Sequence, residues 1–230
     1  LRCFEQIRTD LCCMNLPAVI VGSGPGYTYG GDGPTHHSTQ DIAILRALPE
    51  IAIWNPTDVV LTAASANLAY RNPGPTYIRL EKGILPCLYD EGHDFSDGFH
   101  VLRGGDEVAL IATGIMVHRA LQVAEELSKH AIEAGVVDLY RIKPLRLEVL
   151  LPALGRARRL VTMEESSIVG GVGSLICEAL ADEGKGIPLK RLATPDQHVY
   201  QYGTREWLLD SHGLDVPNMT RTILGWLNDL

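Results

Sequence analysis

The run Pro17-Ala-Val-Ile-Val21, which leads into Gly22-Ser-Gly-Pro-Gly-Tyr-Thr-Tyr-Gly-Gly-Asp-Gly33, decides the fold class of this chain. A short apolar run followed by a glycine-rich stretch is typical of a buried strand that ends in a loop. Helix and strand patterns then alternate: a helix from Thr39 that Pro49 ends, a strand at residues 51–54, a helix with Thr57 as its N-cap, and a strand at residues 76–80. This alternation predicts an α/β fold whose mainly parallel sheet is covered by helices on both faces.

A second alternation begins after residues 81–97, where the periodicity lapses and glycine, proline and acidic residues accumulate. It predicts strands at residues 108–112, 136–139, 160–163 and 189–193, and helices at residues 117–128, 147–154, 172–180 and 219–230. We therefore predict two three-layer α/β domains, residues 1–85 and 99–230, joined by a linker at residues 86–98. The helical pattern begins at Leu1 without a capping residue, which predicts that the first domain is truncated at its N-terminus.

Composition excludes several classes of partner. Lys and Arg number 20 against 28 Asp and Glu, a net charge of −8, and no basic run provides a footprint for nucleic acid. No apolar run approaches the roughly 20 residues that cross a bilayer, so we expect no membrane association. The five cysteines are odd in number and lack paired metal-ligand spacing. We expect free thiols, no protein-bound metal site, and a reducing, cytoplasmic location.

The densest group of reactive side chains is Gly30-Gly-Asp-Gly-Pro-Thr-His-His37, just after the first predicted strand. Ligands of open parallel sheets bind beyond the carboxyl ends of strands, which is where Asp32, His36 and His37 are expected to lie. An alternative is that Gly and Asp only make a turn and that a histidine caps the next helix. Gly31-Asp-Gly also imitates the start of a metal-diphosphate motif, but Asn55 or Asn67 would have to end it, and neither position is suitable.

Six short segments resemble, in order and spacing, the pyrimidine-binding domain of the thiamine-diphosphate-dependent transketolase family. They are Phe4-Glu-Gln-Ile-Arg8, Gly31-Asp-Gly-Pro-Thr-His36, Asp41-Ile-Ala43, Leu45-Arg-Ala-Leu-Pro49, Asn55-Pro-Thr-Asp58 and Tyr77-Ile-Arg-Leu80. The second predicted domain is similar to the C-terminal domain of the same family through Gly114-Ile-Met-Val117, Arg141-Ile-Lys-Pro-Leu145 and Glu164-Glu-Ser-Ser-Ile-Val-Gly-Gly-Val-Gly-Ser174. Among family members, split transketolase C-terminal subunits and 1-deoxyxylulose-5-phosphate synthases are the most similar.

The resemblance implies a transferase that moves a two-carbon ketol or aldehyde-equivalent unit from a ketose or 2-oxo acid to a phosphorylated aldose acceptor. Thiamine diphosphate and Mg²⁺ would be held mainly by an N-terminal domain or subunit, which also carries the activating glutamate, and the complete assembly would be a homodimer. The cofactor-binding residues of this chain remain unassigned. We expect the chain alone to be inactive.

The resemblance also implies roles for particular residues. His36 matches the channel histidine, which stabilises oxyanion character on the donor carbonyl. Asp32 matches a carboxylate that binds a substrate hydroxyl, and Lys82 stands where relatives carry a phosphate-binding Arg. Arg79 is a second substrate-binding candidate, although its position on the opposite face of the strand from Lys82 favours a structural ion pair. His37 is a candidate substrate contact without a family role, and no catalytic residue is assigned to the second domain.

Two other functions stay open at this point. One is the β subunit of a 2-oxo acid dehydrogenase first component, which shares both domains and transfers an acyl group to lipoamide. The other, from a different class, is a non-catalytic dimerisation or regulatory module with the same two domains.

Overall fold

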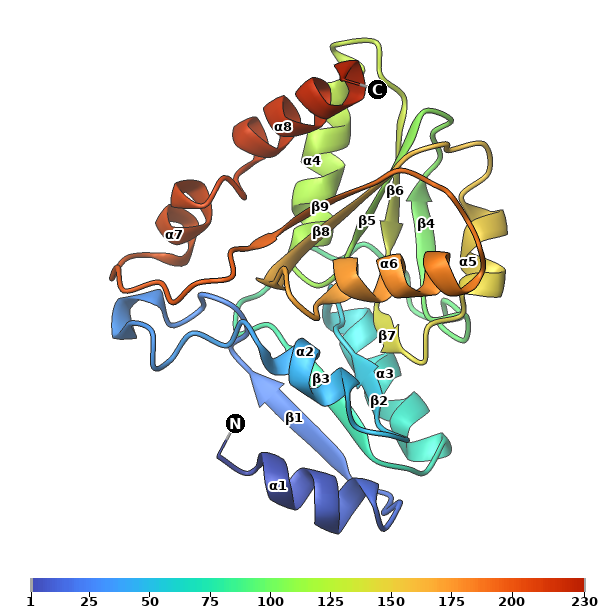
Figure 1. The fold of residues 1–230 in the computed structure, drawn as a ribbon. Coiled ribbons are helices and arrows are strands. Elements are labelled where there is room, and N and C mark those ends of the chain that lie inside the picture. The colour runs from blue at the N-terminus through green and yellow to red at the C-terminus, as the bar shows by residue number, and fades with distance from the viewer. Residues whose placement is uncertain (1, 230) are drawn as a thin grey trace.

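The computed structural model describes residues 2–229 and has two sheets, each flanked by helices (Figure 1). The first sheet has the strand order β1-β3-β2-β7, and the second has the order β4-β6-β5-β8-β9. The strands are β1 (Val19–Ser23), β2 (Ala52–Trp54), β3 (Thr76–Leu80), β4 (His100–Arg103), β5 (Val108–Ala112), β6 (Ala134–Asp138), β7 (Arg141–Lys143), β8 (Leu160–Ser167) and β9 (Leu189–Thr194).

The helices alternate with these strands along most of the chain. The α-helices are α1 (Phe4–Gln6), α2 (Asp41–Arg46), α3 (Val59–Arg71), α4 (Met116–Ser128), α5 (Leu147–Ala153), α6 (Val172–Asp182), α7 (Arg205–Ser211) and α8 (Val216–Asn228). A π-helix, Ile7–Cys12, continues α1, and a 3-10 turn, Gly30–Asp32, lies in the glycine-rich loop. The two ends of the predicted terminal helices, Leu1 and Leu230, lie outside the described residues.

Both sheets are mainly parallel, which confirms the predicted α/β class. β1, β3 and β2 pair in parallel, and β4 and β7 are the antiparallel edge strands of their sheets. The central strands β3, β5, β6 and β8 are buried because parallel strands are covered on both faces. The prediction of a buried strand directly after Pro17 was wrong: β1 is an edge strand of its sheet, and its Val19 and Val21 are 47% and 55% exposed. In β5, Val108 and Leu110 pack into one hydrophobic cluster with α4 and α8, whereas Ala109 and Ile111 pack into another with α5 and α6. This alternation follows from the two-residue period of a strand.

The second hydrophobic cluster also joins the two sheets. It contains Ile42 and Ile53 from the first sheet and its α2 helix together with Ile111 and Val172 from the second. In addition β7, which follows the second sheet's β6 in the chain, pairs with β2 of the first sheet. The chain therefore folds around a core that both sheets share, and segments far apart in sequence meet beside it.

The structure corrects the predicted N-cap of α3 and adds elements that were not predicted. The N-cap of α3 is Asp58, which accepts a hydrogen bond from the Leu61 N–H at 2.8 Å, and Thr57 instead donates its hydroxyl to Asp138 at 2.6 Å. β4, β7 and α7 were not predicted. The second carboxylate oxygen of Asp58 accepts the backbone N–H groups of Leu88 and Tyr89, so the predicted linker is tied to α3. Within residues 2–229, no helix is long and apolar enough to cross a membrane.

Candidate functional site

The glycine-rich loop after β1 is held close to the second sheet. Gly26 has φ +58°, in the left-handed region that glycine enters without strain, and a Cβ there would overlap the side chain of Glu165 at the end of β8. Gly26 also pairs with Ser38 through two backbone hydrogen bonds, of 2.8 and 2.9 Å, which close the loop on itself. The loop is therefore a folded unit whose backbone approaches a buried carboxylate.

A pocket of about 600 Å³ opens beside this loop and the carboxyl-terminal half of β1. Its walls come from the N-terminal helical turn, β1, residues 34–41 and the second domain. The lining includes Phe4, Ile7, Ile20, His36, His37 and Asp41. Residues 197–199 form the wall that the second domain contributes. The pocket thus lies where an open parallel sheet is expected to bind its ligand.

The two predicted histidines both line the pocket, but their environments differ. His36 is exposed, and its Nδ1 lies 3.1 Å from the Thr35 hydroxyl. His37 is half-buried and meets the ring of Tyr27 edge-on, with 5.0 Å between centroids. Burial lowers the pKa of His37, so its ring is mainly neutral at pH 7. Its Nε2 is buried, and no hydrogen bond to it is formed within residues 2–229.

Asp32 and Lys82 are exposed and lie near the outer side of the loop rather than in the pocket wall. Asp32 ends the 3-10 turn, where its N–H donates to the Tyr29 carbonyl at 2.9 Å. The Lys82 ammonium lies 4.5 Å from the centroid of the Tyr29 ring, a cation–π contact. β3 ends at Leu80, so Lys82 lies beyond the strand, and Tyr29 brings it to the loop that carries Asp32.

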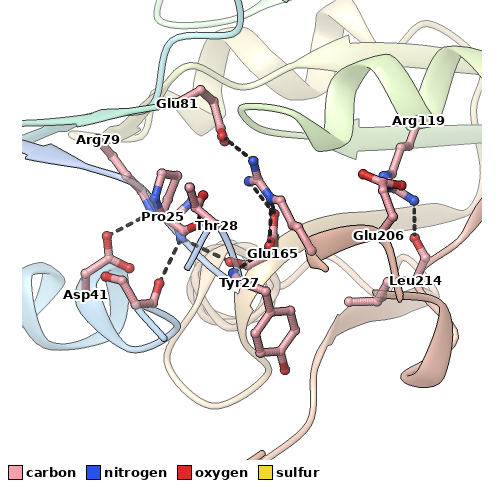
Figure 2. A network of polar contacts seen from close by, with 12 residues as sticks. Pro25, Tyr27, Thr28, Asp41, Arg79, Glu81, Arg119, Glu165, Glu206 and Leu214 are labelled. Atoms are coloured by element: carbon pink, nitrogen blue, oxygen red, sulfur yellow. Dashed lines mark hydrogen bonds and ion pairs between the residues drawn. The ribbon is translucent and has the colours of Figure 1, made fainter. Parts of the chain in front are cut away.

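Arg79 faces inward, as an ion-pair partner. It is 2% exposed, and its Nε donates to Asp41 Oδ2 at 2.8 Å, the oxygen that also accepts from the Tyr77 hydroxyl at 2.8 Å. Its Nη2 donates to the carbonyls of Ser38 and Glu165, at 3.3 and 3.0 Å. Two of its three nitrogens are thus occupied by the protein, which favours the structural role over substrate contact (Figure 2).

The second domain adds polar groups that the sequence did not place at the site. Glu165 Oε1 accepts the Tyr27 N–H at 2.7 Å, and the guanidinium of Arg205 bonds both oxygens of that carboxylate. The same guanidinium reaches Glu81, the residue before Lys82, at 2.7 Å. The one signal in the sequence was the acidic pair Glu164-Glu beside a glycine-rich helix start; nothing marked Arg205.

The neighbouring Glu164 binds the N-terminus of helix α6. Its carboxylate accepts the N–H groups of Val172 and Gly173, at 2.7 and 2.6 Å, and the hydroxyl of Ser166. These N–H groups belong to the first turn of α6, where a carboxylate satisfies free donors and favours the helix dipole. Glu164 therefore acts as a cap for α6 and lies away from the pocket.

The side chains around the pocket do not form a metal centre. Within residues 2–229, no three His, Cys, Asp or Glu side chains are grouped so that they could hold a metal ion.

Comparison with known proteins places the whole chain in one family. Family models match residues 1–86, as the transketolase pyrimidine binding domain, and residues 98–219, as the transketolase C-terminal domain. A 1-deoxy-D-xylulose-5-phosphate synthase of Crocosphaera subtropica is 38% identical over 208 residues, 86% of this chain and 32% of the relative. One of the subunits of the apulose-4-phosphate transketolase of Actinobacillus succinogenes is 33% identical over 219 residues, 95% of this chain and 70% of the relative.

A solved structure has the same fold over almost the entire chain. It is described as a split gene transketolase in an inactive beta4 tetramer, and it superposes with a TM-score of 0.86 at 31% identity over 99% of this chain and 72% of its own. The chain spans about a third of the length of the synthases that it matches, and over two thirds of the length of the A. succinogenes relative and of the split gene transketolase. Both domain models and these relatives agree, and the chain belongs to the transketolase family.

Proposed function

We propose that this chain is the C-terminal portion of a transketolase-type transferase that moves a two-carbon unit from a ketose or 2-oxo acid to a phosphorylated aldose acceptor. The observation that carries the proposal is the pocket at the end of β1, where His36 and His37 share a wall with Asp41. These groups can bind oxygen atoms of a polar substrate, and the family supplies the reaction class.

The family depends on thiamine diphosphate, and the pocket is suited to one side of its aminopyrimidine ring. Phe4, Ile7 and Ile20 offer apolar surface for the faces of a planar ring. Asp41 offers an acceptor for an amino group, because its Oδ1 is buried and has no hydrogen-bond partner within residues 2–229. When bound, the cofactor supplies a carbon nucleophile for the donor carbonyl. The diphosphate and Mg²⁺ would be held by the portion of the enzyme outside this chain.

The residues of this chain would bind and orient the substrate. His36 is exposed at the pocket, where its ring N–H would donate to the oxygen of the reacting carbonyl as negative charge develops there. His37, which also lines the pocket, would hold a second substrate oxygen. Asp32 would accept from a sugar hydroxyl, and the Lys82 ammonium would bind the substrate phosphate as a point charge.

We further propose that a second polypeptide supplies the N-terminal portion and that the complete assembly is dimeric and cytoplasmic. Of the similar proteins, one is described as a subunit and another as the product of a split gene, and the latter formed an inactive tetramer. An assembly of this chain alone is therefore expected to be inactive.

The test is a calorimetric titration of thiamine diphosphate, with Mg²⁺ present, into this chain alone and into its mixture with the candidate N-terminal subunit. We expect the mixture to bind the cofactor and to transfer the two-carbon unit, while the chain alone does neither. If the mixture assembles but binds no cofactor, the transferase proposal fails and a non-catalytic module becomes the better description.

A further inference from the structure

Three charged side chains link the second domain to two separate segments of the site. Arg205, the first residue of α7, donates from Nε to both oxygens of Glu165, at 3.0 and 2.9 Å, and from Nη2 to Oε2 at 2.5 Å. Its Nη1 donates to Glu81 Oε2 at 2.7 Å. One guanidinium therefore bonds both Glu81 and Glu165, the two carboxylates labelled in Figure 2. We call this trio the Arg205 clamp.

The clamp is buried, which makes its geometry costly to disturb. The side chain of Glu165 is 1% exposed, that of Glu81 is 7% and that of Arg205 is 16%. Burial acts to lower the pKa of Arg205, but the two carboxylates outweigh burial and raise it, so the guanidinium stays charged. Removing one partner of a buried charge pair leaves the other charge uncompensated.

One end of the clamp holds the loop. Glu165 Oε1 accepts the Tyr27 N–H at 2.7 Å, and the close approach of Gly26 lets the carboxylate reach it. The backbone carbonyl of Glu165 accepts from Arg79, which also donates to Asp41 and to the Ser38 carbonyl. The position of Glu165 is thus transmitted to both ends of the loop that carries Asp32 and His36.

The other end of the clamp holds Glu81 and determines the charge around Lys82. The Glu81 carboxylate pairs with Arg205 and is 7% exposed, whereas its neighbour Lys82 is exposed. Within residues 2–229, Lys82 takes part in no ion pair, and its ammonium rests on the Tyr29 ring. A released Glu81 carboxylate would compete with a substrate phosphate for Lys82 and would repel that phosphate.

We infer that Arg205 is a positioning residue that sets the spacing between Lys82 and the loop bearing Asp32 and His36, and so favours phosphorylated substrates of matching length. This inference rests on the proposed function, in which those three residues face the substrate. Arg205 itself touches no substrate; it acts through Glu165 and Glu81.

The molecule offers a matched control in Arg119 of α4, whose ion-pair partner is on the same helix as Arg205. Arg119 is 9% exposed and ion-paired at 2.5 Å with Glu206, the residue after Arg205, and it donates to the Leu214 carbonyl at 3.2 Å. Its contacts hold α7 and its following turn against α4, and none reaches the loop (Figure 2). Arg119→Gln and Arg205→Gln therefore both remove a buried arginine that contacts α7 or belongs to it. Only Arg205→Gln removes the ion pairs with Glu165 and Glu81.

The first measurement is amide hydrogen exchange at Tyr27 in this chain, with the N-terminal subunit present. Arg205→Gln should speed exchange there by about tenfold or more, beyond any change at the strands of the second sheet, because Glu165 is no longer held. Arg205→Lys should restore part of the protection, since it keeps the charge and loses the fork. Equal Tyr27 protection in Arg205→Gln and Arg119→Gln overturns the positioning role.

The second measurement is the kinetics of the complete assembly with glyceraldehyde 3-phosphate and glyceraldehyde as paired acceptors. Arg205→Gln should lower kcat/KM for the phosphorylated acceptor by about 10- to 100-fold, mainly through KM, and much less for glyceraldehyde. Arg119→Gln should change kcat/KM by the same factor for both acceptors. Equal losses of kcat/KM for the two acceptors in Arg205→Gln overturn the inference. If the unaltered assembly shows no turnover, that result counts against the proposed function, and the exchange rate at Tyr27 then tests the positioning role of Arg205.

Discussion

Replacing Gly26 by alanine is the sharpest structural test of how the loop is held. Gly26 has φ +58°, and an alanine in the left-handed region costs about 1 to 2 kcal/mol. Its Cβ would also overlap the Glu165 carboxylate, which would have to move away from the Tyr27 N–H. A lost hydrogen bond to a charged group costs about 1.5 to 3 kcal/mol. Together these effects predict a loss of about 2.5 to 5 kcal/mol in the free energy of unfolding.

Gly31→Ala is the control in the same loop. Gly31 has no φ in the left-handed region and no atom within 4 Å of its would-be Cβ, so alanine there should change stability by less than about 0.5 kcal/mol. Urea unfolding of the two variants, followed by tryptophan fluorescence, compares the two free energies directly. If Gly26→Ala costs no more than Gly31→Ala, the description of the loop as a unit fixed by Glu165 is wrong.

Three further predictions concern pH and the site residues. Burial raises the pKa of Asp138 to about 7 from its ordinary 3.8, so the folded state binds this proton more tightly and wild-type stability should fall by about 2 kcal/mol between pH 5 and pH 7. Asp138→Asn should flatten that dependence in urea titrations, and an unchanged slope would contradict the assignment. His36→Ala in the complete assembly should reduce kcat by about 100-fold with thiamine diphosphate affinity nearly intact by calorimetry; an unchanged kcat removes His36 from the mechanism. Lys82→Met should raise KM for a sugar phosphate by about tenfold or more and Lys82→Arg should not, with the unphosphorylated sugar as the control; a uniform effect on both sugars would exclude a phosphate contact.

Much of the fold was accessible from the sequence because several central strands, β5 above all, contain short apolar runs between turn residues. The predicted bounds of β3 and β5, residues 76–80 and 108–112, agree with the structure. Such strands are buried on both faces, so composition alone marks them. The edge strands β4 and β7 carry partly buried polar residues, including His100 and Arg141, and they pair antiparallel with partners that are distant in the chain. Their pairing is determined by tertiary contacts that no local pattern contains.

The residues of the candidate site also fall into those that a local segment predicts and those that only the completed fold brings together. His36 and His37 were predicted from one short segment, and both line the pocket. Arg205 and Glu165 are 40 residues apart, and Arg205 and Glu81 are 124 apart, so their meeting depends on the completed fold. The prediction of Thr57 as the N-cap was wrong because its hydroxyl donates to the buried carboxylate of Asp138. Asp58, the next residue, caps α3 instead.

The clamp changes what the second domain contributes. The resemblance assigns no catalytic residue to that domain, and its role in packing is evident in the core shared by the two sheets. Yet Glu165 accepts the backbone N–H of Tyr27 in the loop that carries Asp32 and His36, and the glycines of that loop add no side chains that could fix its conformation. A buried ion pair adds little net stability in comparison with apolar packing, but it imposes geometry. The second domain therefore contributes contacts that fix the backbone of the loop after β1, in addition to the core that the two sheets share.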